Sequence, residues 1–142
     1  MNHCKKNAEG YLDLTAYNAL LSADQKRKPL RQARRPLVFI CSPFAGDVAA
    51  NTANAIRYCQ FAVRQNMAPF APHLLYPQFL DDRDPTQREL GISLGLAWLR
   101  KCDVVWVFGN RITDGMKREI RSAVKHGMRI KHFNNNLEEI TL

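Results

Sequence analysis

Hydrophobic residues after position 36 occur in short unbroken runs that alternate with longer amphipathic stretches. Strands are predicted at 37–41, 67–71, 103–108 and 128–133, and the first of these is a continuous apolar run bounded by proline and polar residues. Runs of this length are typical of strands covered on both faces. Between them, apolar side chains return at helical spacing in stretches that begin near residues 48, 84 and 114. This alternation predicts an α/β domain with a parallel sheet.

We expect a flavodoxin-like, or Rossmann-like, parallel sheet with strand order 2-1-3-4 and helices on both faces. That order places the switch point between the first and third strands, where ligands bind beyond the carboxyl ends of the strands. The loops 42–47 and 109–115 follow those two strands. They are therefore the predicted rim of a binding site.

Local signals mark the ends of the predicted helices. Asp47 is a natural N-cap for the stretch 48–65. Asp84 followed by Pro85, with Gln87 three residues after the cap, starts a second helix. Gly127 ends the third helix, which covers 114–126. The proline-rich segment 72–77 is predicted to be a loop, and 134–140 a terminal turn of helix.

Helical spacing also predicts which side chains point inward. The expected inward residues are Val48, Thr52, Ala55, Ile56, Cys59, Ala62 and Val63 on the first helix, Leu90, Leu94, Ala97 and Trp98 on the second, and Met116, Ile120, Ala123 and Val124 on the third. Gly91 and Gly95, four positions apart, would let their helix approach a neighbour closely. Trp98 and Trp106 are both expected in the core.

The first 36 residues follow a different pattern. Apolar residues recur at helical spacing within 11–25, which predicts a short amphipathic helix. The stretch 26–36 is polar and basic and ends in proline, as a linker does. The predicted organisation is therefore an N-terminal helical extension with its basic linker, 1–36, followed by one α/β domain, 37–142.

The distribution of charge argues against nucleic acid as the main partner. The chain has a net charge of +8, of which residues 1–36 carry +5 and residues 37–142 only +3. No aromatic interleaving or recognised nucleic-acid-binding module accompanies the basic linker. The linker is therefore interpreted as a solvated connector, with a nucleic-acid arm as the alternative.

Cysteine usage and hydropathy bear on the compartment. The four cysteines, Cys4, Cys41, Cys59 and Cys102, show no C-x-x-C spacing, which favours free thiols in a reducing compartment over disulfides or a zinc site. The first ten residues lack the apolar segment of a secretory signal, and no apolar run approaches the length of a membrane span. We expect a cytoplasmic protein that does not bind membranes.

One carboxylate stands out on the helix predicted over 114–126. At 100° per residue, Glu119 falls on the flank of the inward stripe rather than on the basic outer face. Partial burial near the carboxyl end of the sheet would perturb its pKa, as it does for many functional groups. The alternative is a helix-edge carboxylate paired with an arginine or lysine.

Other polar residues lie on loops at the same rim. Asp81 and Asp82 have no capping duty and could donate a proton or bind sugar hydroxyls, with a solvated turn as the alternative. A short glycine-containing loop before a helix can hold a phosphate or hydroxyl through backbone N–H groups. The candidate substrate-binding residues are Ser42, Pro43, Phe44, Gly46, Asp47, His73, Gly109, Asn110, Asp114, Gly115 and Met116.

Three long motifs carry a resemblance to known proteins. They read V-F-I-C-S-P-F-A-G-D, A-P-H-L-L-Y-P-Q-F-L-D-D and C-D-V-V-W-V-F-G-N-R-I-T-D-G-M-K-R-E-I. Together they resemble a family of uncharacterised bacterial and phage proteins that is distantly similar to the nucleoside 2-deoxyribosyltransferases and nucleotide N-glycosidases. The resemblance covers 37–133. It implies a nucleoside or nucleotide as the small-molecule ligand and a homodimer as a plausible assembly.

The resemblance also implies roles for individual residues. In the enzymes a glutamate on the helix after the third strand attacks the anomeric carbon of the sugar, and an aspartate assists the departing base. By position, Glu119 would be the nucleophile and Asp81 or Asp82 the acid, with the loop 42–47 lining the sugar or phosphate. Water as the second acceptor gives hydrolysis, and another base gives transfer.

The chain departs from these enzymes at two points. Phe44 stands where they commonly have a tyrosine, and Ile120-Arg121 follow Glu119 where they often have Leu-Gly. A second hypothesis therefore stays open, in which the protein senses or sequesters a nucleotide in the same cleft without turnover. Neither hypothesis requires a metal or another cofactor.

Overall fold

The structure, a computed structural model, describes residues 13–26 and 34–141. The chain divides into two units, Met1–Arg34 and Arg35–Leu142, which are described separately. In the first unit, helix α1 (Leu14–Lys26) begins after Asp13, whose carboxylate accepts a hydrogen bond of 2.9 Å from the Thr15 backbone N–H. The helix predicted over 11–25 is confirmed from residue 14 onward. Asp13 precedes the helix, and residues 11 and 12 lie outside the described residues.

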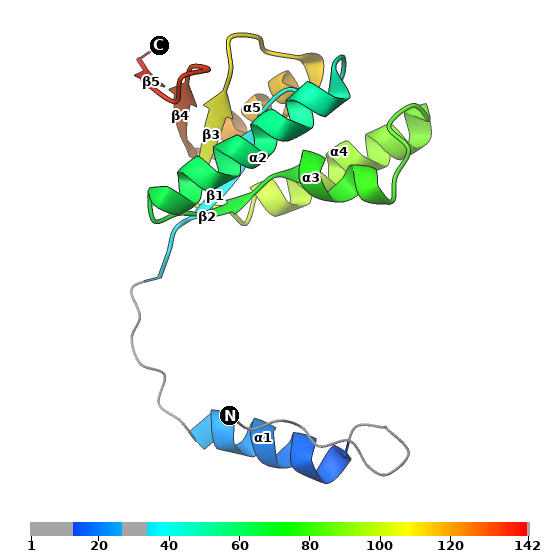
Figure 1. The fold of residues 1–142 in the computed structure, drawn as a ribbon, viewed down its shortest axis with the longest axis vertical. Coiled ribbons are helices and arrows are strands. Elements are labelled where there is room, and N and C mark those ends of the chain that lie inside the picture. The colour runs from blue at the N-terminus through cyan, green and yellow to red at the C-terminus, as the bar shows by residue number, and fades with distance from the viewer. Residues whose placement is uncertain (1–12, 27–33, 142) are drawn as a thin grey trace. The chain divides into compact units, whose positions relative to one another are not determined.

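The second unit is built on one twisted sheet (Figure 1). Its strands are β1 (Leu37–Cys41), β2 (Ala68–Phe70), β3 (Val104–Phe108), β4 (Arg129–Phe133) and β5 (Glu139–Ile140), in the order β2-β1-β3-β4-β5. The first four pair in parallel, and β5 runs antiparallel to β4. The predicted order 2-1-3-4 is confirmed, and the fold is a flavodoxin-like α/β sheet.

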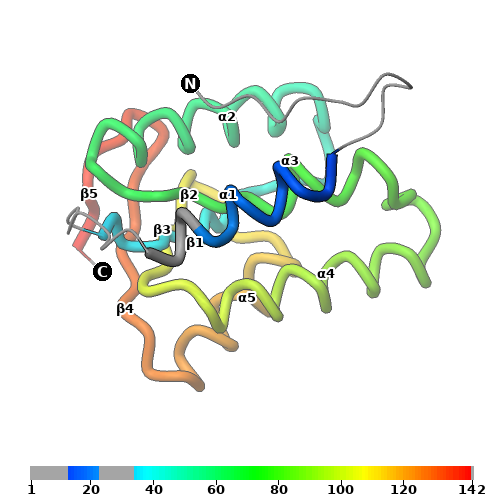
Figure 2. The backbone as a smooth tube through the Cα atoms, turned by 90° about the horizontal axis from the view of Figure 1, so that it is seen from below, coloured from blue at the N-terminus to red at the C-terminus, as the bar shows by residue number. Residues whose placement is uncertain are grey.

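Helices cover both faces of this sheet (Figure 2). Helix α2 (Val48–Arg64) lies on one face, and α4 (Pro85–Leu99) and α5 (Asp114–Lys125) lie on the other. The short helix α3 (Pro72–Leu75) and the 3-10 turn η1 (Tyr76–Gln78) follow β2. The helix starts agree with the predicted caps, since Asp47 accepts from the Ala50 N–H at 3.1 Å and Asp84 from the Thr86 N–H at 2.9 Å.

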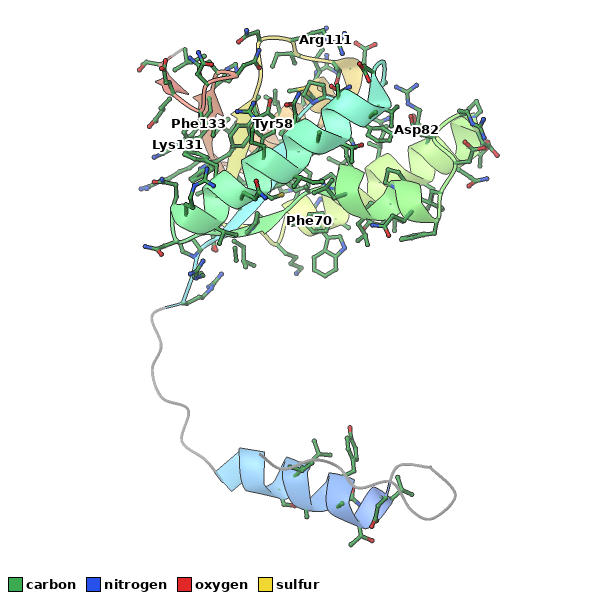
Figure 3. The ribbon with its side chains drawn as sticks, in the orientation of Figure 1. Tyr58, Phe70, Asp82, Arg111, Lys131 and Phe133 are labelled. Atoms are coloured by element: carbon green, nitrogen blue, oxygen red, sulfur yellow. The ribbon has the colours of Figure 1, made fainter. Side chains whose placement is uncertain are left out.

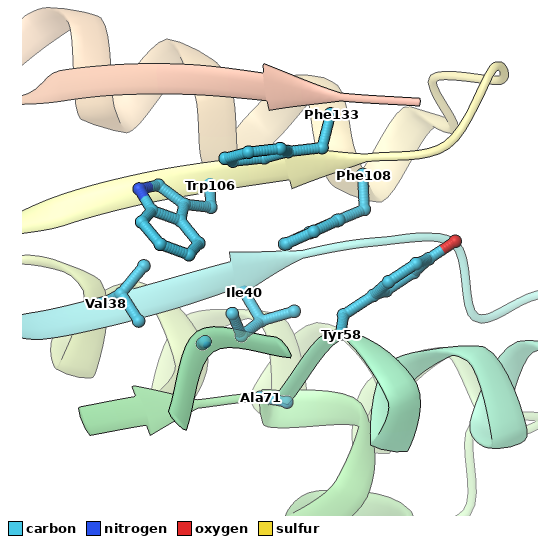
Figure 4. Close-up of a cluster of buried hydrophobic side chains, with 8 residues drawn as sticks. Val38, Ile40, Tyr58, Ala71, Trp106, Phe108 and Phe133 are labelled. Carbon is cyan, nitrogen blue, oxygen red and sulfur yellow. The ribbon is translucent and has the colours of Figure 1, made fainter. Parts of the chain in front are cut away.

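The strands send alternate side chains into two cores. Under α2, Val38 and Ile40 pack with Tyr58, Ala71, Trp106, Phe108 and Phe133 (Figure 4). Phe39 and Cys41 point the other way, where they pack with Leu99, Val105, Val107, Met116 and Ala123 under α4 and α5. Both faces of β1 and β3 are thus buried, as expected for parallel strands in the middle of a sheet.

Two predicted elements are wrong. Residues 72–77 form α3 and the start of η1 instead of a loop, because a proline in the first helical turn needs no N–H partner and presets the backbone angle. Residues 134–140 form a turn and β5 instead of a helical turn. The Asn134 side chain accepts from the N–H groups of Asn136 and Glu138, and this local bonding competes with a helix.

The predicted inward faces are partly wrong. On α4 the buried residues are Gly95 and Leu99, whereas Leu90 is 48% and Trp98 53% exposed. Apolar residues occur all around this helix, so periodicity could not select its face. Val124 of α5 is 65% exposed. Of the α2 residues predicted to point inward, Val48, Ile56 and Val63 are exposed, while Tyr58, which was not among them, is buried.

The glycines of α4 have the predicted packing role. A Cβ built on Gly95 would lie 3.3 Å from Cβ of Pro72, and one on Gly91 would lie 3.6 Å from Cδ1 of Leu80. Helix α4 therefore approaches α3 and the segment after η1 closely. This packing brings the loop around residue 82 next to the carboxyl end of the sheet.

Three further features concern the described residues only. Cys41, Cys59 and Cys102 are free thiols, as predicted, and Cys4 lies outside the described range. None of the helices described has the length and apolar character needed to cross a bilayer. The side chains of 13–22 and 34–141 contain no His, Cys, Asp and Glu group suited to a metal ion.

Candidate active site

Glu119 is a buried carboxylate on the second turn of α5. Only 5% of the residue is exposed, and Oε2 has no hydrogen-bond partner among the described residues. Burial raises the pKa of Glu119 from 4.5 to about 7, opposed by a hydrogen bond with the Cys41 side chain. The sequence placed Glu119 on the flank of the inward face, and the structure buries it further.

The Glu119 side chain lines a small cavity, called here the inner cavity, with a volume of about 40 Å³. This is room for about one water molecule. Its walls come from the loop after β1, from α3, from η1 and the segment that follows it, and from α4. The lining residues are Phe44, Pro72, His73, Tyr76, Pro77, Leu80, Asp82, Gln87, Arg88, Gly91, Ile92, Gly95 and Glu119.

Two larger hollows adjoin the inner cavity. The helix-tip hollow, of about 280 Å³, is lined by the start of α5 at Asp114 and Gly115 and shares Asp82, Arg88 and Ile92 with the inner cavity. The loop hollow, of about 610 Å³, shares Phe44, Pro77, Leu80, Asp82 and Gln87 with it. Asp82 lines all of these spaces, so it stands at the junction between the buried carboxylate and the surface.

His73 and Phe44 form one wall of the inner cavity. Their rings are stacked, with centroids 5.0 Å apart and planes 15° from parallel. Burial lowers the pKa of His73 from 6.5 to about 4, although the charge of Asp82 and a hydrogen bond to the Ser42 backbone act in the opposite direction. The imidazole is therefore neutral at neutral pH and serves as a flat, weakly polar surface.

The two candidate acids have different surroundings. Asp81 is exposed and pairs with Arg83 at 3.1 Å, and hydrogen bonds from Arg83 lower its pKa. It lines the loop hollow but not the inner cavity. Asp82 is half-buried and lines the inner cavity together with Glu119. Figure 3 shows Asp82 and Arg111 on the side of the domain toward which the parallel strands run.

The loop after β1 is held by bonds to its carbonyl groups. Asn51 Nδ2 donates to the Phe44 carbonyl oxygen at 2.9 Å, and Arg111 donates to that of Ala45 at 3.4 Å. Gly46 has φ of +104°, a left-handed conformation that favours glycine. The loop that places Phe44 in the cavity wall is therefore fixed from α2 and from the β3–α5 loop.

The remaining predicted residues divide into two groups. Asp114 and Gly115 line the helix-tip hollow beside Asp82. Other residues lie near the rim or in the core but line none of these three spaces: Ser42, Pro43, Gly46, Asp47, Gly109, Asn110 and Met116. Met116 packs in the core, Asp47 caps α2, and the buried Ser42 hydroxyl has no hydrogen-bond partner among the described residues.

Apart from His73, sequence reasoning missed the wall formed by α3, η1 and α4. This wall includes Tyr76, Gln87, Arg88 and Ile92. The available signal was the Gly91 and Gly95 pair, which predicted a close approach without saying which segment approaches. The partner became visible only once residues 72–77 were known to be helical.

A solved structure shares this fold. The chain is similar to the 2-deoxyribosyltransferase of the psychrotolerant bacterium Bacillus psychrosaccharolyticus, with a TM-score of 0.58 and 16% identity, over 74% of this chain and 77% of that one. It is also similar to the 2-desoxiribosyltransferase of Leishmania mexicana, with a TM-score of 0.48 and 15% identity, over 70% of this chain and 64% of that one. No curated protein sequence matches the chain. The likeness to the first of these structures shows a shared fold, as the predicted resemblance implies.

Residues 36–133 match the family described as a domain of unknown function, DUF7768. Because the match covers more than half of the chain, the chain belongs to that family. The matched segment begins just before β1 and ends with β4, so it includes every residue that lines the inner cavity.

Proposed function

We propose that this member of the DUF7768 family cleaves the N-glycosidic bond of a nucleoside or nucleotide, with Glu119 as the nucleophile. The observation that carries the proposal is the Glu119 carboxylate, which is buried at the inner cavity with an unpartnered Oε2. The fold shared with a deoxyribosyltransferase supports the choice of substrate class. A buried carboxylate with a perturbed pKa in a cavity is typical of functional groups.

The proposed reaction has two steps. The Glu119 carboxylate attacks C1′ of the sugar, a C1′–O bond forms and the C1′–N bond breaks. The base leaves with the proton of Asp82, which this step requires in its protonated form. Water then attacks C1′ and releases the sugar and the Glu119 carboxylate, while its proton returns to Asp82. If a second base attacks instead of water, the product is a new nucleoside.

We assign different spaces to different parts of the substrate on the basis of their volumes. Ligand pockets commonly have volumes of about 300–1,000 Å³, and the inner cavity has only about 40 Å³. We therefore place the reacting sugar carbon at the inner cavity and the remaining parts of the ligand in the adjoining hollows. Asp82, at the junction of these spaces, is positioned to meet the leaving base.

The test is base release from a panel of nucleosides and nucleoside 5′-phosphates, measured by mass spectrometry. The wild-type protein is expected to release base, and Glu119→Gln to reduce the rate by at least about 10³-fold, the scale of losing a covalent nucleophile. The matched control is Glu139→Gln, the same change at an exposed residue of β5. Comparable activity of the two variants would contradict the nucleophile assignment.

The role of Asp82 is tested by the same change at adjacent positions. Asp82→Asn is expected to slow the release of poor leaving bases strongly, because these need protonation most. Asp81→Asn should have little effect, because Asp81 pairs with Arg83 outside the inner cavity. Adding a second free base to the wild-type reaction separates transfer from hydrolysis, since only transfer yields a new nucleoside.

One observation favours the second hypothesis, binding without turnover. The inner cavity is small. Because the pKa of Glu119 is about 7, only about half of the Glu119 side chains are ionised at neutral pH. A protein that binds a nucleotide in the outer hollows alone would show saturable binding and no base release. Binding that is equal for wild type and Glu119→Gln, with no turnover on any substrate, would replace the enzymatic proposal with this one.

A further inference from the structure

A stripe of apolar side chains on α4 lies at the surface. Its members have the i, i+4, i+7 and i+8 spacing of a helix that packs against another element. They are called here the α4 stripe and are Leu90, Leu94, Ala97 and Trp98. In the structure Leu90 is 48% and Trp98 53% exposed, Ala97 is exposed, and Leu94 is half-buried. The α4 stripe thus has the pattern of a packing face, yet the described part of the chain leaves it largely open.

The opposite face of α4 makes the contacts of this helix with its own domain. Gly95 and Leu99 are buried there, and a Cβ built on Gly95 would lie 3.3 Å from Cβ of Pro72. Single exposed apolar residues are ordinary on a protein surface, but a contiguous apolar patch marks an interaction site. The α4 stripe is such a patch, because it runs along about two turns of one helix.

The charges at the two ends of α4 indicate what covers the stripe. Residues 81–84, just before the helix, contain three aspartates and one arginine, a net charge of −2. Arg100 and Lys101, just after it, carry +2, and neither forms an ion pair among the described residues. The next acid, Asp103, is engaged by the Leu37 N–H at 2.7 Å. A second α4 running antiparallel would place its basic end beside this acidic end, whereas a parallel one would bring like charges together.

We propose that the α4 stripe is the interface of a homodimer in which two α4 helices pack antiparallel about a two-fold axis near Leu94. Because Leu94 is the midpoint of the stripe, this axis places Leu90 of each copy against Trp98 of the other. The small side chain of Ala97 lets the two helices approach closely. An apolar centre with charged ends is the usual anatomy of a protein interface, and a two-fold axis uses the same patch on both copies.

The proposed interface and the proposed active site use different faces of α4. Ile92 and Gly95 line the inner cavity. At about 100° per residue, they lie on the side of the helix away from Leu90 and Leu94. Pairing the stripes therefore leaves the cavity wall in place. The inference does not depend on the activity proposed for Glu119, and its tests measure association alone.

The first test is equilibrium sedimentation of the full chain at about 1–100 μM, a range that covers interfaces of modest affinity. The wild type is expected to approach twice the 16.3 kDa of one chain as its concentration rises. Leu94→Asp sets two carboxylates beside each other at the axis and should weaken association at least about tenfold. Leu90→Asp, at an exposed position, should also weaken it, and it decides the result if Leu94→Asp does not unfold cooperatively.

Two control variants make the same kind of change outside the stripe. Val124→Asp, at a 65% exposed residue of α5, should leave association unchanged. Leu21→Asp, at a 45% exposed residue of α1, should leave it unchanged as well. Loss of the dimer in Leu21→Asp would assign the interface to α1 and overturn the proposal. A wild type that stays monomeric over the whole range, or a dimer that persists in both stripe variants, would also overturn it.

The second test determines the direction of the two helices by disulfide cross-linking, with oxidised glutathione as the oxidant. Leu94→Cys, at the axis, should link to the same residue of the second copy, and the wild type gives the baseline for the native cysteines. Leu90→Cys and Trp98→Cys should each link poorly to themselves and well to each other when the two variants are mixed. Self-linking of Leu90→Cys as strong as in that mixture would show parallel packing and overturn the proposed arrangement.

Discussion

Replacing Glu119 with glutamine should stabilise the protein at alkaline pH. The folded-state pKa of Glu119 is about 7, above the ordinary value of 4.5, because burial disfavours the charged carboxylate. The folded protein therefore binds this proton more tightly than the unfolded chain does. It follows by linkage that stability is lost as pH rises from about 4.5 through 7.

The size of the effect follows from the shift. Each unit of pKa difference corresponds to about 1.36 kcal/mol, so a shift of about 2.5 units costs about 3 kcal/mol once Glu119 is ionised in both states. This is a large part of the roughly 5–15 kcal/mol by which a domain is stable. Glutamine has nearly the same shape and remains neutral at every pH, so the variant lacks the free-energy cost of ionising a buried carboxylate.

The assay is urea unfolding of wild type and Glu119→Gln at pH 4, 5, 6, 7, 8 and 9. The difference in unfolding free energy should be near zero at pH 4 and reach about 3 kcal/mol in favour of the variant by pH 9. Using differences at each pH cancels the contribution of all other titrating groups. Glu139→Gln, at an exposed carboxylate, should remain within about 0.5 kcal/mol of wild type throughout. Parallel curves for wild type and Glu119→Gln would refute the burial argument.

Three further predictions follow from the fold and its charges. His73→Gln should reduce the loss of stability as pH falls from 6.5 toward 4, because burial lowers the pKa of His73 to about 4. Urea midpoints at pH 4 and 6.5 measure this loss, and an equal loss in wild type and variant would contradict the prediction. Deleting residues 1–34 should leave a cooperative thermal unfolding transition, because the α/β unit begins at Arg35, which donates a hydrogen bond to the Val63 carbonyl. A molten or insoluble product would show that residues 1–34 are needed for folding. Duplex DNA and single-stranded RNA should bind weakly at physiological salt, measured by fluorescence anisotropy. Tight binding that is lost on removing 26–35 would oppose this.

The arrangement of strands could be predicted because the evidence for it is local. Unbroken apolar runs at 37–41 and 104–108 identify strands buried on both faces, and helices between them require parallel connections. Helix starts were equally readable, since Asp47 and Asp84 act through neighbouring backbone N–H groups. These features depend on residues within a few positions of each other.

The walls of the candidate site could not be predicted because they depend on packing between distant segments. Apolar residues occur on all sides of helix α4, so periodicity could not show that Gly95 packs against Pro72 or that Trp98 is exposed. The different surroundings of Asp81 and Asp82 could not be predicted for the same reason. Both are acids on one loop, and the bond from Arg83 and the position of the inner cavity distinguish them.

Glu119 illustrates how a stability cost can point to function. Buried polar atoms are nearly always hydrogen-bonded, and an unpaired one is destabilising. Here Oε2 of a carboxylate has no partner among the described residues, and ionising it costs about 3 kcal/mol. A neutral or apolar residue at position 119 would stabilise this α/β unit better. A trade-off between stability and activity produces residues that are unfavourable for folding and that border a cavity. Under the proposed mechanism, the desolvation that raises its pKa also leaves the ionised oxygen free to attack a sugar carbon, because no protein group has to be displaced first.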